Sequence, residues 1–206
     1  MLHAELWNAN QDLARACRAH PFVRGLADGT LPTDAFRRYI AQDTFFLRAF
    51  LRAYAATAAR VDDLDLVQEL HDLMGGVLEE LKLHRAYAQR LQIDLDGVRP
   101  YAATRAYTDF LMRTAWQSPP GETLAAMTPC MRLYAWLGCS LAPPIPSNPY
   151  ADWIHNYASP AFEALAARLE ALLDRLAENT PAVRDAYRYA LEYELNFFAA
   201  PLEESP

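Results

Sequence analysis

Apolar residues recur at three- and four-residue spacings along almost the whole chain, which is the pattern of amphipathic α-helices. The period-two alternation typical of strands is nearly absent. The pattern predicts an all-α protein, an irregular bundle of about eight helices. The expected helical segments are 2–18, a short one ending near 26, 33–60, 63–91, 101–117, 122–141, 150–157, one starting at Ser159-Pro160, and one from Thr180-Pro181 to about 198.

Polar, glycine and proline clusters separate these segments. Residues 28–32 form a predicted turn and residues 94–100 a loop, while Gly75-Gly76 allows a local bend. Residues 142–150 contain four prolines, too many for a regular element. A capping residue followed by proline, as at Ser159-Pro160, is a helix start signal. No linker divides the chain, so we expect a single domain over residues 1–206.

Composition narrows the class of protein. Hydrophobic residues make up 52% of the chain, as in a folded protein, and the net charge is −7 without a basic block, which argues against nucleic acid as a partner. No basic segment precedes an apolar run at the N-terminus, and no stretch of eighteen apolar residues occurs, so we expect a soluble, cytoplasmic protein without membrane contact. Three cysteines without a CxxC pair imply neither a disulfide framework nor a zinc site.

Cys130 follows Pro129 inside a predicted helix. Proline removes a backbone donor, so we expect the helix to be kinked or newly started there, with Cys130 near unsatisfied N–H groups. Such a position favours the nucleophilic thiolate. The alternative is a buried, inert core cysteine. The inward face that carries it is Met127, Cys130, Leu133, Tyr134, Leu137 and Leu141.

Two carboxylates interrupt faces that are otherwise apolar. Asp43 shares a face with Tyr39, Phe46, Phe50 and Tyr54, and Glu194 shares one with Val183, Tyr187, Ala190 and Phe197. A buried, unpaired charge costs about 3–5 kcal/mol, so each acid must pair, take up a proton or meet a polar ligand. Burial without a cation would raise the pKa of Glu194 into the range of a general acid and base. Alternatively, each acid reaches an arginine or a backbone group at the edge of the core.

Aromatic residues accompany these groups on several helices. They form either flat walls around a planar ring or an aromatic-rich core, and periodicity alone does not choose between the two. The residues are Phe45, Phe46, Tyr107, Tyr134, Tyr157 and Phe197.

Five segments, in order along the chain, resemble motifs of the TenA (thiaminase II) family. His20–Pro32 resembles its HPFvxgixdGtLp opening, and Tyr39–Leu47 its YxxQDxxyL motif. Glu80–His84 resembles ExxLH, Pro129–Tyr134 resembles PCxxxY, and Glu194–Phe198 resembles the closing ExxFW. The likeness covers nearly the whole chain and implies a heme-oxygenase-like helical fold. Cys130 places the chain in the branch that keeps the motif cysteine.

The resemblance implies an activity in thiamin salvage. Family members hydrolyse substituents from the 5-methylene carbon of a 4-amino-2-methylpyrimidine, either the aminomethylpyrimidine left by thiamin degradation or thiamin itself. The product is hydroxymethylpyrimidine, and no cofactor or metal is required. The implied partner is this small aminopyrimidine, and the implied assembly is a homotetramer.

The same resemblance assigns site residues. Cys130 corresponds to the nucleophile that adds to the pyrimidine ring, and Glu194 to the general acid and base. The substrate-binding residues are Asp43 at the amino-pyrimidine edge, Tyr107 and Tyr134 as supporting groups, and Phe46 and Tyr157 as lining. Two positions depart from the pattern: Phe46 stands where some members have tyrosine, and Phe198 replaces a tryptophan.

Two other classes of function stay open. A di-iron oxidase on the same fold needs facing histidine and carboxylate ligands, for which the pairs are Glu80 with His84 and Asp152 with His155. The last helix has no histidine, so we expect His84 and His155 to be structural or surface residues. Heme needs an axial histidine, and His20, before a proline, suits a turn better.

The second class is a non-catalytic regulator or partner-binding domain. The charge of −7 argues against direct DNA contact, whereas protein binding remains open. Leu6 and Trp7 are expected to be exposed and available for subunit contacts.

Overall fold

The computed structural model describes residues 1–203, and these form ten helices and no strand. The helices are α1 (Leu2–Ala9), α2 (Gln11–Ala19), α3 (Pro21–Asp28), α4 (Thr33–Ala58), α5 (Leu64–Leu91), α6 (Ala102–Gln117), α7 (Pro120–Leu141), α8 (Ala151–Tyr157), α9 (Pro160–Leu176) and α10 (Pro181–Glu203). The all-α prediction is confirmed. Residues 204–206 of the expected domain lie outside the described residues.

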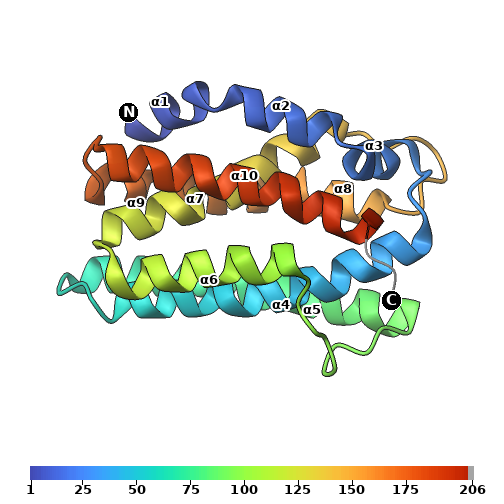
Figure 1. The fold of residues 1–206 in the computed structure, drawn as a ribbon, viewed down its shortest axis with the longest axis horizontal. Helices are drawn as coiled ribbons and strands as arrows, with labels where there is room; N and C mark the ends of the chain where they lie inside the picture. The colour runs from blue at the N-terminus through green and yellow to red at the C-terminus, as the bar shows by residue number, and fades with distance from the viewer. Residues whose placement is uncertain (204–206) are drawn as a thin grey trace.

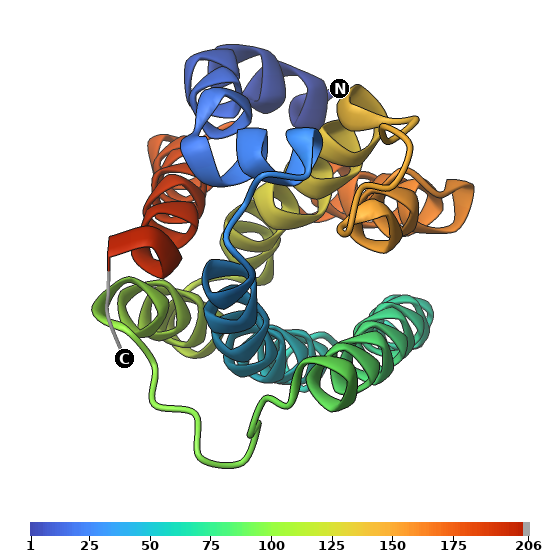
Figure 2. The same cartoon turned by 90° about the vertical axis from the view of Figure 1, so that its right-hand side faces the viewer.

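The helices pack in layers around α7. Helices α4, α5 and α6 form the lower layer in Figure 1, α10 lies above them, and α1 to α3 run along the top. Helix α7 packs against α10, α9 and α8, and α4 packs against α5 and α6. The end view in Figure 2 shows α7 inside the ring of other helices. Its buried positions run almost without interruption from Gly121 to Gly138, as expected of a helix that is apolar on all sides.

Helix α7 passes through Pro129 without ending, so the expectation of a new helix start there is wrong. Since proline lacks an N–H, the group that loses its helical partner is the carbonyl of Ala125, and no N–H is freed beside the cysteine. The Thr128 hydroxyl donates to the Leu124 carbonyl at 2.7 Å in the same turn. Cys130 therefore lies in the middle of a helix rather than at its N-terminus.

The first predicted helix is divided in two. Asn10, with φ −116° and ψ 21°, separates α1 from α2, and its side-chain amide donates to the Leu6 carbonyl at 2.8 Å. Asparagine competes with the helix by such local bonds, which apolar periodicity does not reveal. At the other end of the chain, α10 continues beyond the predicted end at 198, through Pro201.

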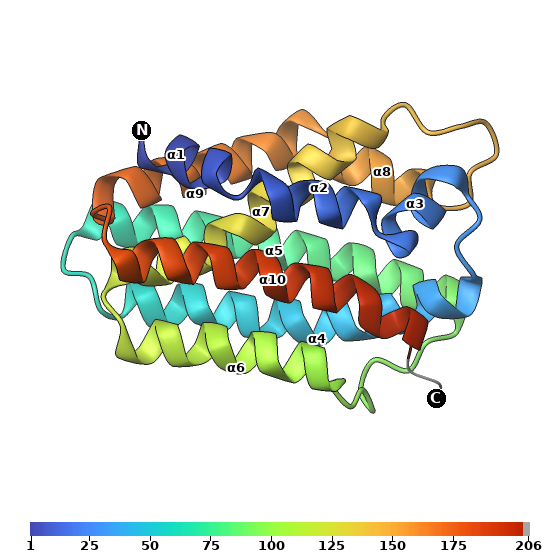
Figure 3. The same ribbon diagram turned by 45° about the horizontal axis from the view of Figure 1, so that its top comes forward.

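The predicted helix starts are confirmed by their caps. Ser159 Oγ accepts from the Phe162 N–H at 3.1 Å, and Thr180 Oγ1 accepts from the Val183 N–H at 3.2 Å. His20 caps α3, since its Nδ1 lies 3.2 Å from the Phe22 nitrogen, in line with the expectation that it belongs to a turn. The proline-rich connection from α7 to α8 runs beside α3 (Figure 3), where Asn148 donates to the Leu26 and Ala27 carbonyls.

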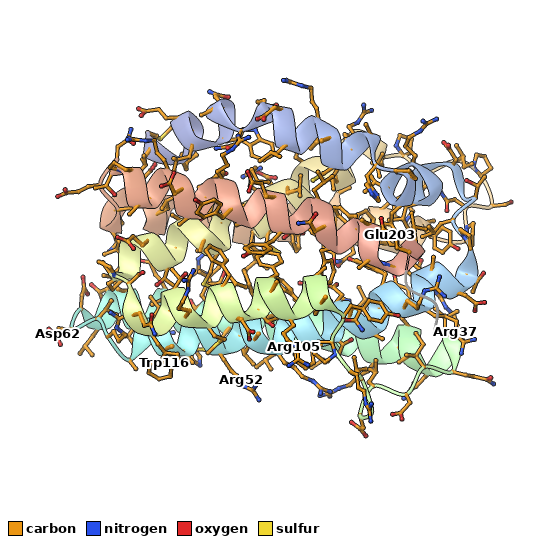
Figure 4. The ribbon with its side chains drawn as sticks, viewed as in Figure 1. Arg37, Arg52, Asp62, Arg105, Trp116 and Glu203 are labelled. Carbon is orange, nitrogen blue, oxygen red and sulfur yellow. The ribbon has the colours of Figure 1, made fainter. Side chains whose placement is uncertain are left out.

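The outer surface carries the charge. Figure 4 labels Arg52, Asp62 and Arg105 at the outside of the lower layer, and all three are exposed. Leu6, by contrast, is 2% exposed and belongs to the core, so its predicted role in subunit contacts is wrong. Trp7 is partly buried and packs edge-on against Trp136, with ring centroids 5.8 Å apart. None of the helices described within residues 1–203 is both long and apolar enough to cross a membrane.

A glycine allows α8 to lie close to α7. A Cβ added at Gly138 would lie 2.3 Å from the carbonyl carbon of Tyr157, whereas one added at Gly75 would meet nothing within 4 Å. We expect Gly138→Ala to destabilise the protein by about 1–3 kcal/mol or more, because backbone must move. Gly75→Ala, the matched control in a helix interior, is expected to stabilise it by about 0.5–1 kcal/mol. Equal free energies of unfolding for the two variants in urea would contradict this account of the contact.

Candidate active site

Glu194 on α10 is a buried carboxyl that forms no ion pair with any residue described by the structure. Glu194 is 1% exposed, and the Tyr107 hydroxyl donates a hydrogen bond to its Oε1 at 2.8 Å. Burial raises the pKa of Glu194 to about 8, with the hydrogen bond from Tyr107 and the interaction with Cys130 opposing the rise. The predicted rise is confirmed, and the alternative of an arginine partner is wrong. Near neutral pH this carboxyl can both give and take a proton.

Cys130 on α7 is buried beside Glu194. Burial raises the pKa of its thiol well above the usual range, and the negative charges of Glu194, Glu80 and Asp43 raise it further. The expectation of a resting thiolate is therefore wrong, because acids surround the sulfur and α7 offers no free N–H groups. A thiolate can form here when the thiol proton passes to the neighbouring Glu194 carboxylate.

Asp43 on α4 is paired with His84 on α5. His84 Nε2 lies 2.8 Å from Asp43 Oδ2, and His84 Nδ1 lies 2.9 Å from the backbone carbonyl oxygen of Glu80. Both ring nitrogens face acceptors, so both carry protons and the ring is an imidazolium. Burial opposes this charge, but the hydrogen bond and charge of Asp43 together raise the pKa of His84 above its ordinary value. The buried ion pair fixes Asp43 as an oriented carboxylate.

His84 is thus structural, as expected, and it is not on the surface. The alternative prediction that Asp43 reaches an arginine or a backbone group is wrong, because its partner is His84. The four-residue spacing of Glu80 and His84 was the available signal, but it was weighed only for a metal. Helices α4 and α5 pack together along their length, which is what brings His84 to Asp43.

The predicted aromatic residues line this interior, with one exception. Phe46 packs on Tyr107 with ring centroids 4.7 Å apart, and Tyr134 packs on Tyr157 at 4.9 Å. All four are buried. Phe45 does not belong to this wall, because it faces outward into a surface cleft between α4 and α6.

Further buried groups complete the site. The Tyr39 hydroxyl donates to that of Tyr134 at 3.3 Å and accepts from Trp153 Nε1 at 3.3 Å. The Tyr157 hydroxyl donates to Glu80 Oε1 at 2.5 Å. Trp153 and Glu80 were not expected in the site from the sequence. Their positions depend on how α8 packs against α7 and how α5 packs against α4, which no single-helix pattern shows.

Two residues depart from the family pattern, Phe198 and Phe46, and the structure shows what each contacts. Phe198 is fully buried and its ring lies 5.7 Å from that of Phe22 and 5.8 Å from that of Tyr134, so it fills the space behind the site. Phe46 has no hydroxyl, but the Tyr107 hydroxyl beside it reaches Glu194.

The proposed metal-ligand pairs do not converge. Both nitrogens of His84 face protein acceptors, Asp152 pairs with Arg90 at 3.1 Å, and His155 is exposed. In the part of the chain described by the structure, no three His, Cys, Asp or Glu side chains are grouped as metal ligands. His155 is a surface residue, as expected.

A thiol beside a protonatable carboxyl, faced by an ion-paired carboxylate in an aromatic interior, defines an α-helical enzyme that combines a nucleophile with a general acid and base. The chain belongs to the TENA/THI-4/PQQC family, whose sequence model matches residues 5–204.

Relatives with assigned names support this placement. The chain is 34% identical to the aminopyrimidine aminohydrolase of Halalkalibacterium halodurans, over 85% of this chain and 81% of that protein. It is also 34% identical to the aminopyrimidine aminohydrolase of Bacillus subtilis, over 78% and 70%. The bifunctional TH2 protein of Arabidopsis thaliana is 38% identical over 89% of this chain, which spans only 34% of that longer protein.

Solved structures share the fold. A TenA family transcription regulator from Silicibacter sp. TM1040 superposes with a TM-score of 0.91 at 27% identity, covering 98% of this chain and 96% of that one. A TenA homologue from Pyrococcus furiosus gives a TM-score of 0.90 at 22% identity, covering 98% and 100%.

Proposed function

We propose that this chain is an aminopyrimidine aminohydrolase of the thiaminase II type that acts in thiamin salvage. It hydrolyses the C–N bond of 4-amino-5-aminomethyl-2-methylpyrimidine, and of thiamin as a second substrate, to give the 5-hydroxymethyl product. The observation that carries the proposal is the thiol of Cys130 beside Glu194, with the Asp43 and His84 pair in the same interior. The names of the bacterial relatives support the reaction class.

The arrangement accounts for each proton in the reaction. The Cys130 thiol passes its proton to the Glu194 carboxylate as sulfur bonds to a ring carbon. Glu194 then donates that proton to the amine as its bond to the methylene carbon breaks. Water adds to the methylene carbon and gives a proton to Glu194, which returns it to the sulfur as the bond from sulfur to the ring breaks. The net change is amine and water to alcohol and ammonia.

The other site residues bind the ring. Asp43, held as a carboxylate by His84, accepts hydrogen bonds from the 4-amino edge of the pyrimidine. The aromatic side chains of Phe46, Tyr107, Tyr134 and Tyr157 form the walls that contact a flat heteroaromatic ring. Such walls exclude water from the reacting atoms.

Product formation tests the proposal. The purified chain is incubated separately with the aminomethylpyrimidine and with thiamin, and hydroxymethylpyrimidine is measured by liquid chromatography. We expect release from the aminomethylpyrimidine at the higher kcat/KM. Absence of product from both substrates would overturn the proposed function.

The resemblance also supports three broader proposals. The chain is a single domain, acts in the cytoplasm and assembles as a homotetramer. The three cysteines are free, which suits a reducing compartment. Sedimentation at micromolar concentration distinguishes a tetramer from a monomer, and a monomer across that range would contradict the proposed assembly.

A further inference from the structure

Glu80 on α5 is an acid that the reaction described above does not use. It lies at a cleft of about 270 Å³ between α5 and α9, together with Glu79 and Met131. Met131 is the residue that follows Cys130 on α7. Glu80 is only partly buried, whereas Asp43 and Glu194 are 4% and 1% exposed. Of these three acids, it is the one in contact with the cleft.

Glu80 is also connected to the interior by a direct hydrogen bond. The Tyr157 hydroxyl donates to Glu80 Oε1 at 2.5 Å, and Tyr157 itself is 2% exposed and packs against Tyr134. Glu80 and Glu194 interact with the Cys130 thiol, while Glu194 is held by Tyr107 on α6 and Glu80 by Tyr157 on α8. Two carboxyl and tyrosine pairs, carried by different helices, thus interact with the sulfur.

A third feature is a buried hydroxyl that interacts with both Cys130 and Glu80. The Tyr54 hydroxyl is completely buried and has no hydrogen-bond partner among the described residues. It interacts electrostatically with both Cys130 and Glu80. A buried hydroxyl without a partner is costly, and it indicates where a polar atom of a ligand or a water binds.

We propose that Glu80, acting through Tyr157, lends a proton to the ring nitrogen of the bound aminopyrimidine and takes it back, while the α5–α9 cleft lets Glu80 equilibrate with solvent between turnovers. The inference rests on the proposed function. In the acid form of Glu80, its O–H donates to the Tyr157 oxygen, and the Tyr157 O–H is then free to face the ring nitrogen. When sulfur bonds to the ring carbon, an electron pair moves to that nitrogen, which takes the Tyr157 hydroxyl proton while Glu80 gives its own proton to the Tyr157 oxygen. When the sulfur leaves, both transfers reverse, so no net proton is consumed.

The charges around Glu80 suit this role. Burial raises the pKa of Glu80 to about 7, with the His84 imidazolium lowering it and Asp43 raising it. The acid form that the relay needs is therefore populated near neutral pH. The titratable groups that face Glu80 are Asp43, Tyr39 and Tyr54 on α4, His84 on α5, Cys130 on α7 and Tyr157 on α8.

Glu80→Gln and Glu79→Gln test the relay. Glu79 lines the same cleft and is exposed beside Lys82, so its variant makes the same change of charge outside the path. We expect Glu80→Gln to lower kcat about a hundredfold with little change in KM, and Glu79→Gln to match the wild type. Formate, small enough for the cleft, is expected to restore part of the lost rate. An unchanged kcat in Glu80→Gln would overturn the proposal.

The pH profile separates a relay from a structural role. Activity needs Glu194 as a carboxylate and Glu80 as an acid, so kcat/KM of the wild type rises up to about pH 7 and falls above about pH 8. In Glu80→Gln the fall above pH 8 is expected to disappear. A fall that persists unchanged would assign the titration to another group and refute the relay.

Two tyrosine variants complete the design. Tyr157→Phe is expected to lose as much kcat as Glu80→Gln, and the double variant no more than either, because both remove one path. Additive losses would contradict the path. Tyr54→Phe is expected to raise KM without lowering the free energy of unfolding, since the hydroxyl has no hydrogen-bond partner within residues 1–203. Product formation by the wild type and its absence in Cys130→Ser would support the proposed function. If Glu80→Gln then kept the wild-type kcat, only the relay would be refuted.

Discussion

Cys130→Ser is expected to slow hydroxymethylpyrimidine formation at least about a hundredfold. A serine hydroxyl at the same place has almost the same volume but is a far weaker nucleophile, and the anionic surroundings that raise the pKa of the thiol oppose an alkoxide even more strongly. Because the side chain is buried and the substitution is small, we expect the substrate still to bind. The measurement is kcat and KM for the aminomethylpyrimidine by liquid chromatography.

The control for this variant lies on the same helix. Cys139 on α7 is free and exposed, and Cys139→Ser is expected to keep the wild-type kcat. Equal activity of Cys130→Ser and the wild type would show that the sulfur forms no bond to the substrate. Loss of activity in both variants would point to general damage rather than chemistry.

Glu194→Gln is expected to lower kcat by about 10²–10⁴-fold. Glutamine keeps the size of the side chain and an oxygen for the Tyr107 hydroxyl, but it cannot take the thiol proton or donate to the leaving amine. Glu192→Gln is the matched control, since Glu192 is two residues away on α10, partly exposed, and paired with Arg188 at 3.3 Å. A Glu194→Gln enzyme with more than about a tenth of the wild-type kcat would exclude the general acid and base role.

The same variant is expected to change how stability depends on pH. Glu194 has an ordinary pKa of 4.5 and a pKa of about 8 when folded, so the folded protein holds a proton that the unfolded chain releases between these values. This contribution is fully present below about pH 4.5 and is lost as pH rises through about 8. Thermal unfolding between pH 5 and 9 is therefore expected to show a steeper loss of stability in the wild type than in Glu194→Gln. Parallel curves would mean that the carboxyl is not buried in solution.

The sequence predicted the faces of the helices better than the contacts between them. The apolar periodicity around Asp43 and Glu194 correctly placed both carboxylates in the interior. It did not identify His84 as the partner of Asp43, because that ion pair joins α4 to α5 across 41 positions of sequence. Burial of Glu194 among apolar residues was enough to anticipate the direction of its pKa.

At Cys130, tertiary packing decides the structure against the local preference of the preceding proline. Proline before cysteine indicated a helix N-terminus and an activated thiolate, but tertiary packing carries α7 through Pro129. The sulfur then responds to acids from three other helices rather than to its own helix. Glu80 was missed for a related reason: its role depends on Tyr157, which the close approach of α7 and α8 at Gly138 places in reach.

The acidic surroundings of Cys130 also govern which reagents can damage the protein. Peroxides and alkylating agents react with thiolates, and a thiol whose pKa is raised far above the ordinary value offers almost none of that form at rest. Exposed Cys139 is open to the same reagents. Oxidants would therefore modify Cys139 at the surface before they modify Cys130 in the interior. Such a protein could keep its capacity to recover a damaged vitamin under the conditions that damage it.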